Sequence, residues 1–229
     1  MRRWKRPSAS SEPQLSKTRY DSIVFDLDGT LWDASEASAT GWNRGLQVAG
    51  VERASITADS IRSVSGLPFE QCVATLIPDT DLRRSQGLSV LIDTAEQDVI
   101  RELGGTIFSG VTAGIEALSR THSIFIVSNC QDWYLDCFWQ FADIRRFITD
   151  FDCHGLSSLL KSEMIARLVA RHGLNRPIYI GDTLGDEEAT REAGIDFGCV
   201  AYGFGQAENP TAAFDSFPTL VKWFQARND

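Results

Sequence analysis

The sequence predicts an α/β protein with a parallel sheet, helices on both faces of that sheet and an inserted helical cap domain. Four short apolar runs have the pattern of strands buried on both faces, namely residues 22–27, 123–128, 177–181 and 196–201. Helical segments alternate with these runs along the chain. This alternation is typical of a Rossmann-like core, in which crossover helices connect parallel strands.

The helical segments divide the chain into a core and an insert. Helices are expected over residues 112–121, 131–142, 158–172, 184–193 and 218–227. Between the first two strands the pattern is mainly helical, with expected helices at 34–49, 57–63, 68–76 and 85–103. We therefore expect an α/β core made of residues 20–33 and 105–229, and a helical cap made of residues 34–104.

Charge is distributed unevenly along the chain. The 229 residues carry a net charge of −9, yet residues 1–19 contain six basic residues and a single acid. We expect these first 19 residues to form a disordered basic tail, because they lack an amphipathic pattern and contain two prolines. The remainder is strongly acidic, so we expect no nucleic-acid partner, since phosphate binding needs an excess of Lys and Arg.

Cysteine usage and hydropathy indicate a compartment. The five cysteines form no CxxC pair, which is typical of free thiols in a reducing environment. No run approaches 18 apolar residues, so neither a membrane span nor a membrane partner is expected. A cytoplasmic protein fits both observations, and a monomer and a homodimer both remain open.

The sequence FDLDGTLWD, Phe25 to Asp33, carries the strongest chemical signal. Asp26 and Asp28 stand two residues apart where the first expected strand gives way to a loop, so both carboxylates can face one pocket. Two neighbouring acids repel each other and need a cation or a proton. Mg²⁺ is the natural partner, because it prefers oxygen ligands and binds one or two carboxylates together with water.

Three further motifs follow in order. Ser128 ends the second strand in IVSN, Lys161 lies at the start of a helix, and GDTLGD runs from Gly181 to Asp186 after the third strand. All lie at the ligand-binding edge of an open α/β sheet. With DLDGT, this series resembles the haloacid dehalogenase superfamily, whose members are mostly phosphatases. The resemblance covers residues 20–205 and is to the helical-cap subgroup of phosphoglycolate phosphatases and β-phosphoglucomutases.

This resemblance implies an aspartate nucleophile. In the family pattern Asp26 attacks the phosphate ester and forms an aspartyl-phosphate. Asp28 protonates the leaving alkoxide and later accepts a proton from the hydrolytic water. Dehalogenases of the superfamily lack the second acid, because a halide leaves without a proton. The presence of Asp28 therefore favours a phosphatase.

The resemblance also implies the groups around the reacting phosphate. The phosphate would be held by Ser128, Asn129 and Lys161, the last of which would also keep Asp26 ionised. Mg²⁺ would be bound by Asp26, Asp182 and the main-chain carbonyl of Asp28. Support from outside the ligand set would come from Asp186 and Thr30. We expect the acids that follow, Glu187 and Glu188, to be solvated.

The expected cap carries the candidates for substrate contact. Residues 63–70, SVSGLPFE, resemble the glycine-containing cap loop that faces the catalytic centre in relatives. Within it Ser65, Gly66 and Leu67 are expected to contact substrate. Asp33, where the chain enters the cap, is expected to face the substrate or act as a hinge.

Three functions remain open on sequence alone. A magnesium-dependent phosphatase acting on a small phosphorylated metabolite is the leading hypothesis. A phosphomutase of the β-phosphoglucomutase type would share the same motifs but return the phosphoryl group to the sugar. The third alternative is a binding protein that has kept the fold without catalysis, although every catalytic position is filled.

Overall fold

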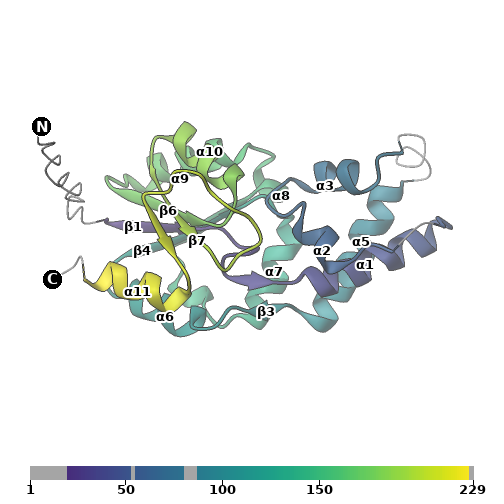
Figure 1. Cartoon of the computed structure of the whole chain (residues 1–229), viewed down its shortest axis with the longest axis horizontal. Helices are drawn as coiled ribbons and strands as arrows, with labels where there is room; N and C mark the ends of the chain where they lie inside the picture. Colours follow the sequence, from purple (N-terminus) through teal and green to yellow (C-terminus); the bar gives the residue numbers. More distant parts are fainter. Residues whose placement is uncertain (1–19, 53–54, 80–86, 227–229) are drawn as a thin grey trace, which may run out of the picture.

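The computed structural model describes residues 20–52, 55–79 and 87–226 (Figure 1). The expected basic tail lies outside the described residues. The same holds for residues 85–86 and 227, at the ends of two expected helices. In the described ranges, an α/β core stands beside a helical insert, as the sequence predicts.

Six parallel strands form the central sheet of the described chain, in the order β5-β4-β1-β6-β7-β8. Their bounds are Asp150–Cys153, Ser123–Ser128, Ser22–Phe25, Pro177–Gly181, Asp196–Val200 and Ala212–Phe214. The four expected strands are β1, β4, β6 and β7. The chain runs from β1 outward through β4 to β5 and returns on the other side of β1, so the strand order reverses at β1, where ligands bind in such sheets.

Alternate strand residues face two separate cores, because side chains of a strand point to opposite faces. On one face, Ile23 and Phe25 pack beneath α6 (Val111–Ser119), α7 (Asp132–Phe141) and α11 (Phe217–Gln225). On the other, Val24 and Tyr179 pack beneath α9 (Lys161–His172) and α10 (Leu184–Ala193). Figure 1 shows α9 and α10 on one side of the sheet and α6 and α11 on the other.

Strand β5 was not predicted, because its sequence DFDC alternates acids with apolar residues. Those acids are neutralised by α9, which packs beside the strand. The Asp150 carboxylate lies 2.9 Å from the Arg171 guanidinium and 2.7 Å from His172 Nε2. Asp152 pairs with Arg167. The pairing joins residues 15 to 22 positions apart, so a search for apolar runs does not reveal the strand.

The helix expected over 158–172 begins three residues later than predicted, at Lys161, and a separate short helix precedes it. Helix α8 (His154–Ser157) ends at Ser158, whose φ of 55° lies in the left-handed region and stops the helix. Helix α9 begins at Lys161, and the Glu163 carboxylate accepts a hydrogen bond of 2.9 Å from the Leu160 N–H just before it. This break places Lys161 in the first turn of α9, at the ligand-binding edge of the sheet. A short 3₁₀ turn, Arg145–Phe147, precedes β5.

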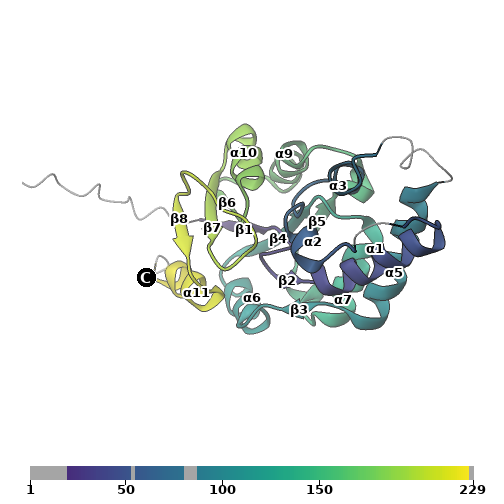
Figure 2. The same ribbon diagram turned by 45° about the vertical axis from the view of Figure 1, so that its right-hand side comes forward.

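The insert is a set of helices joined to the core by a two-stranded stem. The stem pairs β2 (Trp32–Asp33) with β3 (Thr106–Ile107) in antiparallel register. Between them lie α1 (Ser35–Val48), α2 (Ala58–Arg62), α3 (Phe69–Leu76) and α5 (Leu88–Leu103), which gather at the end of the molecule opposite α11 (Figure 2). Their shared core includes Trp42, Leu46, Val73, Leu88 and Ile92. No helix in the described ranges is long and apolar enough to cross a bilayer.

Two glycines let α1 and α5 pack backbone against backbone. A Cβ on Gly41 would lie 2.4 Å from Glu96 Cα, and one on Gly45 would lie 2.6 Å from Ile92 Cα. Real Cβ atoms do not approach backbone so closely. The spacing of these glycines therefore fixes how α1 and α5 meet, and with it the position of Glu96.

We expect Gly45→Ala to destabilise the protein, although alanine raises helix propensity by about 1 kcal/mol. The added methyl group must push α1 away from α5, and overpacking of this kind costs about 1–3 kcal/mol. Urea unfolding measures the change. Thr40→Ala, on the exposed side of α1, is the control, because it raises helix propensity without adding atoms to the interface. A Gly45→Ala variant as stable as the wild type would contradict the close approach of the two helices.

Candidate active site

The four motifs meet at the carboxyl edge of the sheet. Asp26 follows β1, Ser128 ends β4 and Asp182 follows β6, while Lys161 opens α9. The register of β1 with β4 and β6 brings these positions level, since Phe25 pairs with both Ile126 and Ile180. The Asp26 N–H also donates to the Ile180 carbonyl at 2.8 Å. Three strand ends far apart in sequence thus supply one site, together with Lys161 at the start of α9.

A buried ion cluster lies at its centre. Lys161 Nζ is 3.0 Å from Asp26 Oδ1 and 2.6 Å from Asp186 Oδ1, and all three side chains are at most 5% exposed. Burial raises the pKa of Asp26, and the Lys161 ammonium counteracts this, leaving the pKa at about 6. Burial lowers the pKa of Lys161, but the two carboxylates outweigh it and hold the pKa above its ordinary value. The ammonium therefore keeps Asp26 available as an anion at neutral pH.

Both carboxylate oxygens of Asp186 accept hydrogen bonds. Its Oδ2 accepts hydrogen bonds from the main-chain N–H groups of Asp182, at 3.2 Å, and Thr183, at 3.1 Å, and from the Thr183 hydroxyl at 2.7 Å. Its Oδ1 accepts from Lys161. With both oxygens engaged, Asp186 positions Lys161 and the loop after β6.

Asp182 has one oxygen that is satisfied and one that is not. Its Oδ2 accepts from the N–H groups of Phe204, at 2.6 Å, and Gly205, at 3.2 Å. Its Oδ1 is buried and has no hydrogen-bond partner among the described residues. Burial, and next the charges of Asp186 and Asp26, raise the pKa of Asp182 to about 8 against the hydrogen bonds from Phe204 and Gly205. A buried carboxylate oxygen without a hydrogen-bond partner, next to another carboxylate, would be stabilised by a positive charge.

A divalent cation fits this arrangement. One carboxylate oxygen each from Asp26, Asp182 and Asp186 lies within 4.8 Å of the others. Glycines make room around Asp182, because a Cβ on Gly29 or Gly203 would lie 2.3 Å from its side chain. Since Asp186 is taken up by hydrogen bonds, Asp26 and Asp182 are the carboxylates left to bind the cation.

Asp28 lies in a different environment from Asp26. Its Oδ1 accepts a hydrogen bond of 2.5 Å from the Tyr134 hydroxyl of α7. Burial, helped by the Asp26 charge and opposed by the Tyr134 hydrogen bond, raises the pKa of Asp28 to about 7. Asp28 can therefore carry a proton near neutral pH, which a general acid needs.

The remaining core positions differ in how their side chains are engaged. The Ser128 hydroxyl accepts from the Cys130 N–H at 3.3 Å. Asn129 donates its side-chain amide to the Gly66 carbonyl of the insert at 2.7 Å. Thr30 accepts from the Tyr202 hydroxyl through its main-chain oxygen, while its buried Oγ1 has no partner among the described residues. Thr30 thus secures the loop by its backbone.

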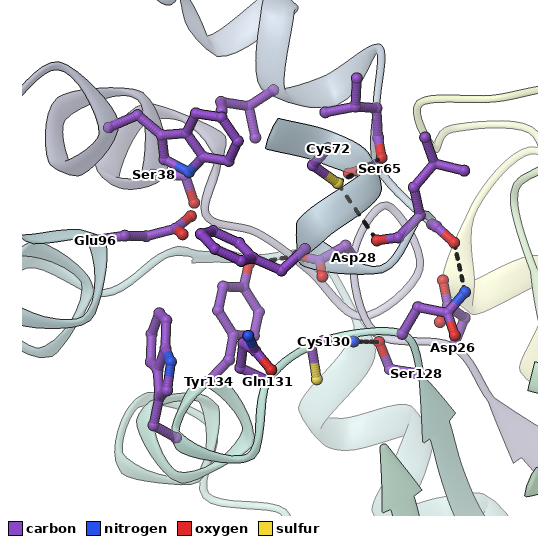
Figure 3. A pocket seen from close by; sticks show the side chains of 18 residues that line it. Asp26, Asp28, Ser38, Ser65, Cys72, Glu96, Ser128, Cys130, Gln131 and Tyr134 are labelled. Atoms are coloured by element: carbon purple, nitrogen blue, oxygen red, sulfur yellow. Dashed lines mark hydrogen bonds between the residues drawn. The ribbon is translucent and has the colours of Figure 1, made fainter. Parts of the chain in front are cut away.

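A cavity of about 90 Å³ separates the sheet edge from the insert. Asp26, Asp28, Ser128 and Asn129 line its core side, and the expected loop residues Ser65, Gly66 and Leu67 line its insert side. Figure 3 shows Asp26 and Ser128 at one end of the lining, Asp28 and Tyr134 near the middle, and Glu96 with Ser38 at the other end. The structure thus brings the motif residues Asp26, Asp28, Ser128 and Asn129 to one pocket with the expected cap loop, while Lys161 and Asp182 do not line it.

Asp33 does not face this cavity. Its Oδ1 accepts from the main-chain N–H of Ser35 at 2.9 Å and from the Ser35 hydroxyl, and its Oδ2 accepts from Arg62 at 2.8 Å. The described residues that line the cavity do not include it. Asp33 is thus engaged in β2, at the junction of core and insert, and its role as a hinge or substrate-facing residue stays a prediction.

The chain matches a family model. Residues 23–200 match the model described as haloacid dehalogenase-like hydrolase. The chain belongs to this family. The match includes β1, the helical insert and the strands through β7, and so contains every motif residue described above.

Curated relatives of this hydrolase are distant in sequence. A phosphoglycolate phosphatase from Nitrosospira multiformis is 24% identical over 211 residues, covering 82% of this chain and 86% of the relative. A 5'-nucleotidase from Pseudomonas aeruginosa is 25% identical over 196 residues, covering 83% and 86%. Because two different activities stand at the same distance, identity does not choose between their substrates.

Solved structures share the fold. A haloacid dehalogenase-like family hydrolase from Streptococcus pneumoniae aligns with a TM-score of 0.77 at 23% identity, covering 90% of this chain and 99% of that chain. A predicted phosphatase from Clostridium acetobutylicum aligns with a TM-score of 0.75 at 17% identity, covering 91% and 100%. The likeness extends over core and insert together.

Several site residues of this hydrolase were not predicted. Tyr134 bonds Asp28 from an aromatic stretch that signals only a core helix. The loop at 203–205 holds Asp182, and its two glycines after a strand end were the available signal. Glu187 was expected to be solvated, which is wrong, because its buried carboxylate accepts from the N–H groups of Glu208 and Asn209.

Removing the Lys161 ammonium tests the ion cluster. Lys161→Met leaves the Asp26 and Asp186 carboxylates buried without a positive partner, so the free energy of unfolding at pH 8 should fall by about 3–5 kcal/mol. Urea unfolding in the presence of chelator measures the loss. Lys222→Met, on the exposed side of α11, is the matched control and should change stability by less than about 0.5 kcal/mol.

The loss in Lys161→Met should shrink as the pH falls. Lys161 lowers the pKa of Asp26, so without it the folded-state pKa rises further above the unfolded value of about 3.9. The folded variant then binds more protons than the unfolded chain, and its stability falls as the pH rises through that window. A deficit as large at pH 5 as at pH 8 would show that charge burial is not its cause.

Proposed function

We propose that this chain is a magnesium-dependent phosphomonoester hydrolase that acts on a small phosphorylated metabolite through an aspartyl-phosphate. The observation that carries the proposal is the contrast between two carboxyl groups two residues apart. Asp26 is paired with an ammonium group, whereas Asp28 bonds a neutral hydroxyl and has its pKa raised to about 7. Such a pair suits one nucleophile and one proton donor.

In the first half-reaction Asp26 supplies the electron pair. A carboxylate oxygen of Asp26 forms a bond to phosphorus while the ester P–O bond breaks. The departing alkoxide takes the proton of Asp28, and Asp28 becomes a carboxylate. The products of this step are the free alcohol and a phosphoryl group on Asp26.

In the second half-reaction water releases the phosphoryl group. The water oxygen attacks phosphorus, Asp28 takes a proton from it, and the bond between phosphorus and Asp26 breaks. Inorganic phosphate leaves, Asp26 is again a carboxylate and Asp28 is again protonated. The hydrogen bond from Tyr134 orients Asp28 for both proton transfers.

The negative charge of the phosphate would be balanced by Lys161 and by the bound cation. Lys161 and the groups of Ser128 and Asn129 would hold phosphate oxygens, in keeping with their positions at the sheet edge. Asp26 and Asp182 would bind the cation, which we propose to be Mg²⁺ with the main-chain carbonyl of Asp28 as a further ligand. When bound, the cation neutralises negative charge on the transferring group.

We also propose that residues 34–104 act as a cap over a core made of residues 20–33 and 105–229. A closed cap excludes water and completes the pocket. Two contacts support this role. Asn129 of the core donates to Gly66 of the insert at 2.7 Å, and the Arg62 guanidinium lies over the Phe204 ring at 5.7 Å. The stem of β2 and β3 stands at the proposed boundary.

Phosphate release from a panel of phosphate esters tests this function. The panel contains phosphoglycolate, sugar phosphates, nucleoside monophosphates and an aryl phosphate, each with magnesium and with chelator. We expect magnesium-dependent release from at least one class. Asp26→Asn should lower kcat by at least about 1,000-fold, because it removes the nucleophile. Circular dichroism of this variant should match the wild type.

Asp136→Asn, on the exposed side of α7, is the matched control and should keep wild-type turnover. Wild-type activity in Asp26→Asn would refute the proposed nucleophile. Conversion of β-glucose 1-phosphate to the 6-phosphate without phosphate release would indicate the phosphomutase instead. Silence across the panel, with the aryl phosphate untouched, would favour a binding protein.

A further inference from the structure

The end of the cavity away from Asp26 carries a second polar group that the hydrolytic steps do not use. Glu96 of α5 lines the cavity there, together with Ser38 and Trp42 of α1. The Glu96 side chain is buried, and so is the Trp42 indole, which is only 2% exposed. Figure 3 shows Glu96 and Ser38 at the end of the lining that lies opposite Asp26 and Ser128.

The hydrogen-bond donors around Glu96 favour its carboxylate form, but they do not outweigh the effect of burial. Burial raises the pKa of Glu96 to about 8, whereas the Ser38 hydroxyl and the Trp42 N–H, which lie beside the carboxyl, act in the opposite direction. The buried Trp42 Nε1 still completes no hydrogen bond with any described residue. A Glu96 carboxylate would accept hydrogen bonds from both donors. A cation that enters the cavity would lower the pKa of Glu96 and so favour the carboxylate form.

Carboxyl groups surround this end of the cavity. The charges of Asp93 and Asp28 both raise the pKa of Glu96. Among the cavity-lining residues in the described ranges, none is a lysine, arginine or histidine. The ammonium of Lys161 is engaged by Asp26 and Asp186, and the Arg62 guanidinium is engaged by Asp33 and Asp59. A substrate with a second anionic group would therefore meet carboxyl groups without a positive partner.

Aromatic rings also line the cavity, namely those of Trp42, Phe69, Trp133 and Tyr134. The Trp133 N–H donates to Asp93 Oδ1 at 3.0 Å, which holds the indole in place and leaves its ring to the cavity. Aromatic rings around a carboxylate attract organic cations, because the ring faces carry negative potential.

We propose that the alcohol part of the substrate carries a protonated amine, which binds Glu96 and the surrounding aromatic rings while the phosphate binds at Asp26. The substrate class is thus an aminoalkyl phosphate. The cavity of about 90 Å³ is far smaller than sites for drug-sized ligands, so the carbon chain between the amine and the phosphate is short. This inference rests on the proposed phosphatase function and narrows it to substrates with a cationic end.

Binding can be measured without turnover. Calorimetry with magnesium and the full-length Asp26→Asn protein compares 2-aminoethyl phosphate, 2-hydroxyethyl phosphate and phosphoglycolate, which differ in the charge of one end. We expect the amine to bind at least about ten-fold more tightly than the alcohol, and phosphoglycolate to bind most weakly. Phosphoglycolate binding as tightly as the amine would overturn the proposal.

Glu96→Gln, made on the same background, tests the assigned partner. The substitution keeps the shape and removes the charge, so the preference for the amine over the alcohol should fall by at least about ten-fold. Glu102→Gln, exposed near the end of the same helix, is the matched control and should keep the preference. If Glu96→Gln weakened both ligands equally, Glu96 would have a structural role only, and the proposal would fail.

Turnover of an aryl phosphate by the wild-type protein separates this inference from the proposed function. Magnesium-dependent aryl phosphate hydrolysis without an amine preference in binding would overturn the aminoalkyl class and leave the phosphatase intact. An amine preference that Glu96→Gln abolishes, without hydrolysis of any ester, would support the cationic subsite and refute the hydrolytic function.

Discussion

The ammonium of Lys161 lets this chain bury carboxylates side by side at one edge of a sheet. Asp26, Asp182 and Asp186 lie within 4.8 Å of one another, and burial together with mutual repulsion would protonate them without a positive charge. Lys161 meets two of them, and the third, Asp182, keeps a buried oxygen open for a cation. The charge balance of the site is thus completed only when a cation binds.

The backbone is arranged around this charge. The neighbouring parallel strands β1 and β6 place Asp26 and Asp182 side by side. The break at Ser158 sets the start of α9, so that Lys161 reaches Asp26 and Asp186. Gly203 leaves space beside Asp182. These features come from local sequence signals, namely strand ends, a helix start and a glycine. This is why the motif residues could be located from the sequence, and why the structure brings them together.

Features that depend on contacts between distant segments could not be predicted from local sequence signals. Strand β5 carries acids that Arg167 and Arg171 neutralise and to which His172 is hydrogen-bonded, and no apolar run marks the strand in the sequence. Glu96 lies beside Trp42 because Gly41 lets α1 pack closely against α5. In the proposed function the family motifs would hold the phosphate, whereas the packing of the insert sets which side chains line the opposite end of the pocket.

In the proposed mechanism Asp26 carries the phosphoryl group during turnover. Rapid acid quench of the wild-type protein mixed with a phosphate ester and magnesium, followed by peptide mass spectrometry, tests it directly. We expect the peptide that contains Asp26 to gain the mass of one phosphoryl group, and Asp26→Asn to show no such gain. A phosphoryl group on another residue, or phosphate release that never passes through a phosphorylated protein, would contradict the role assigned to Asp26.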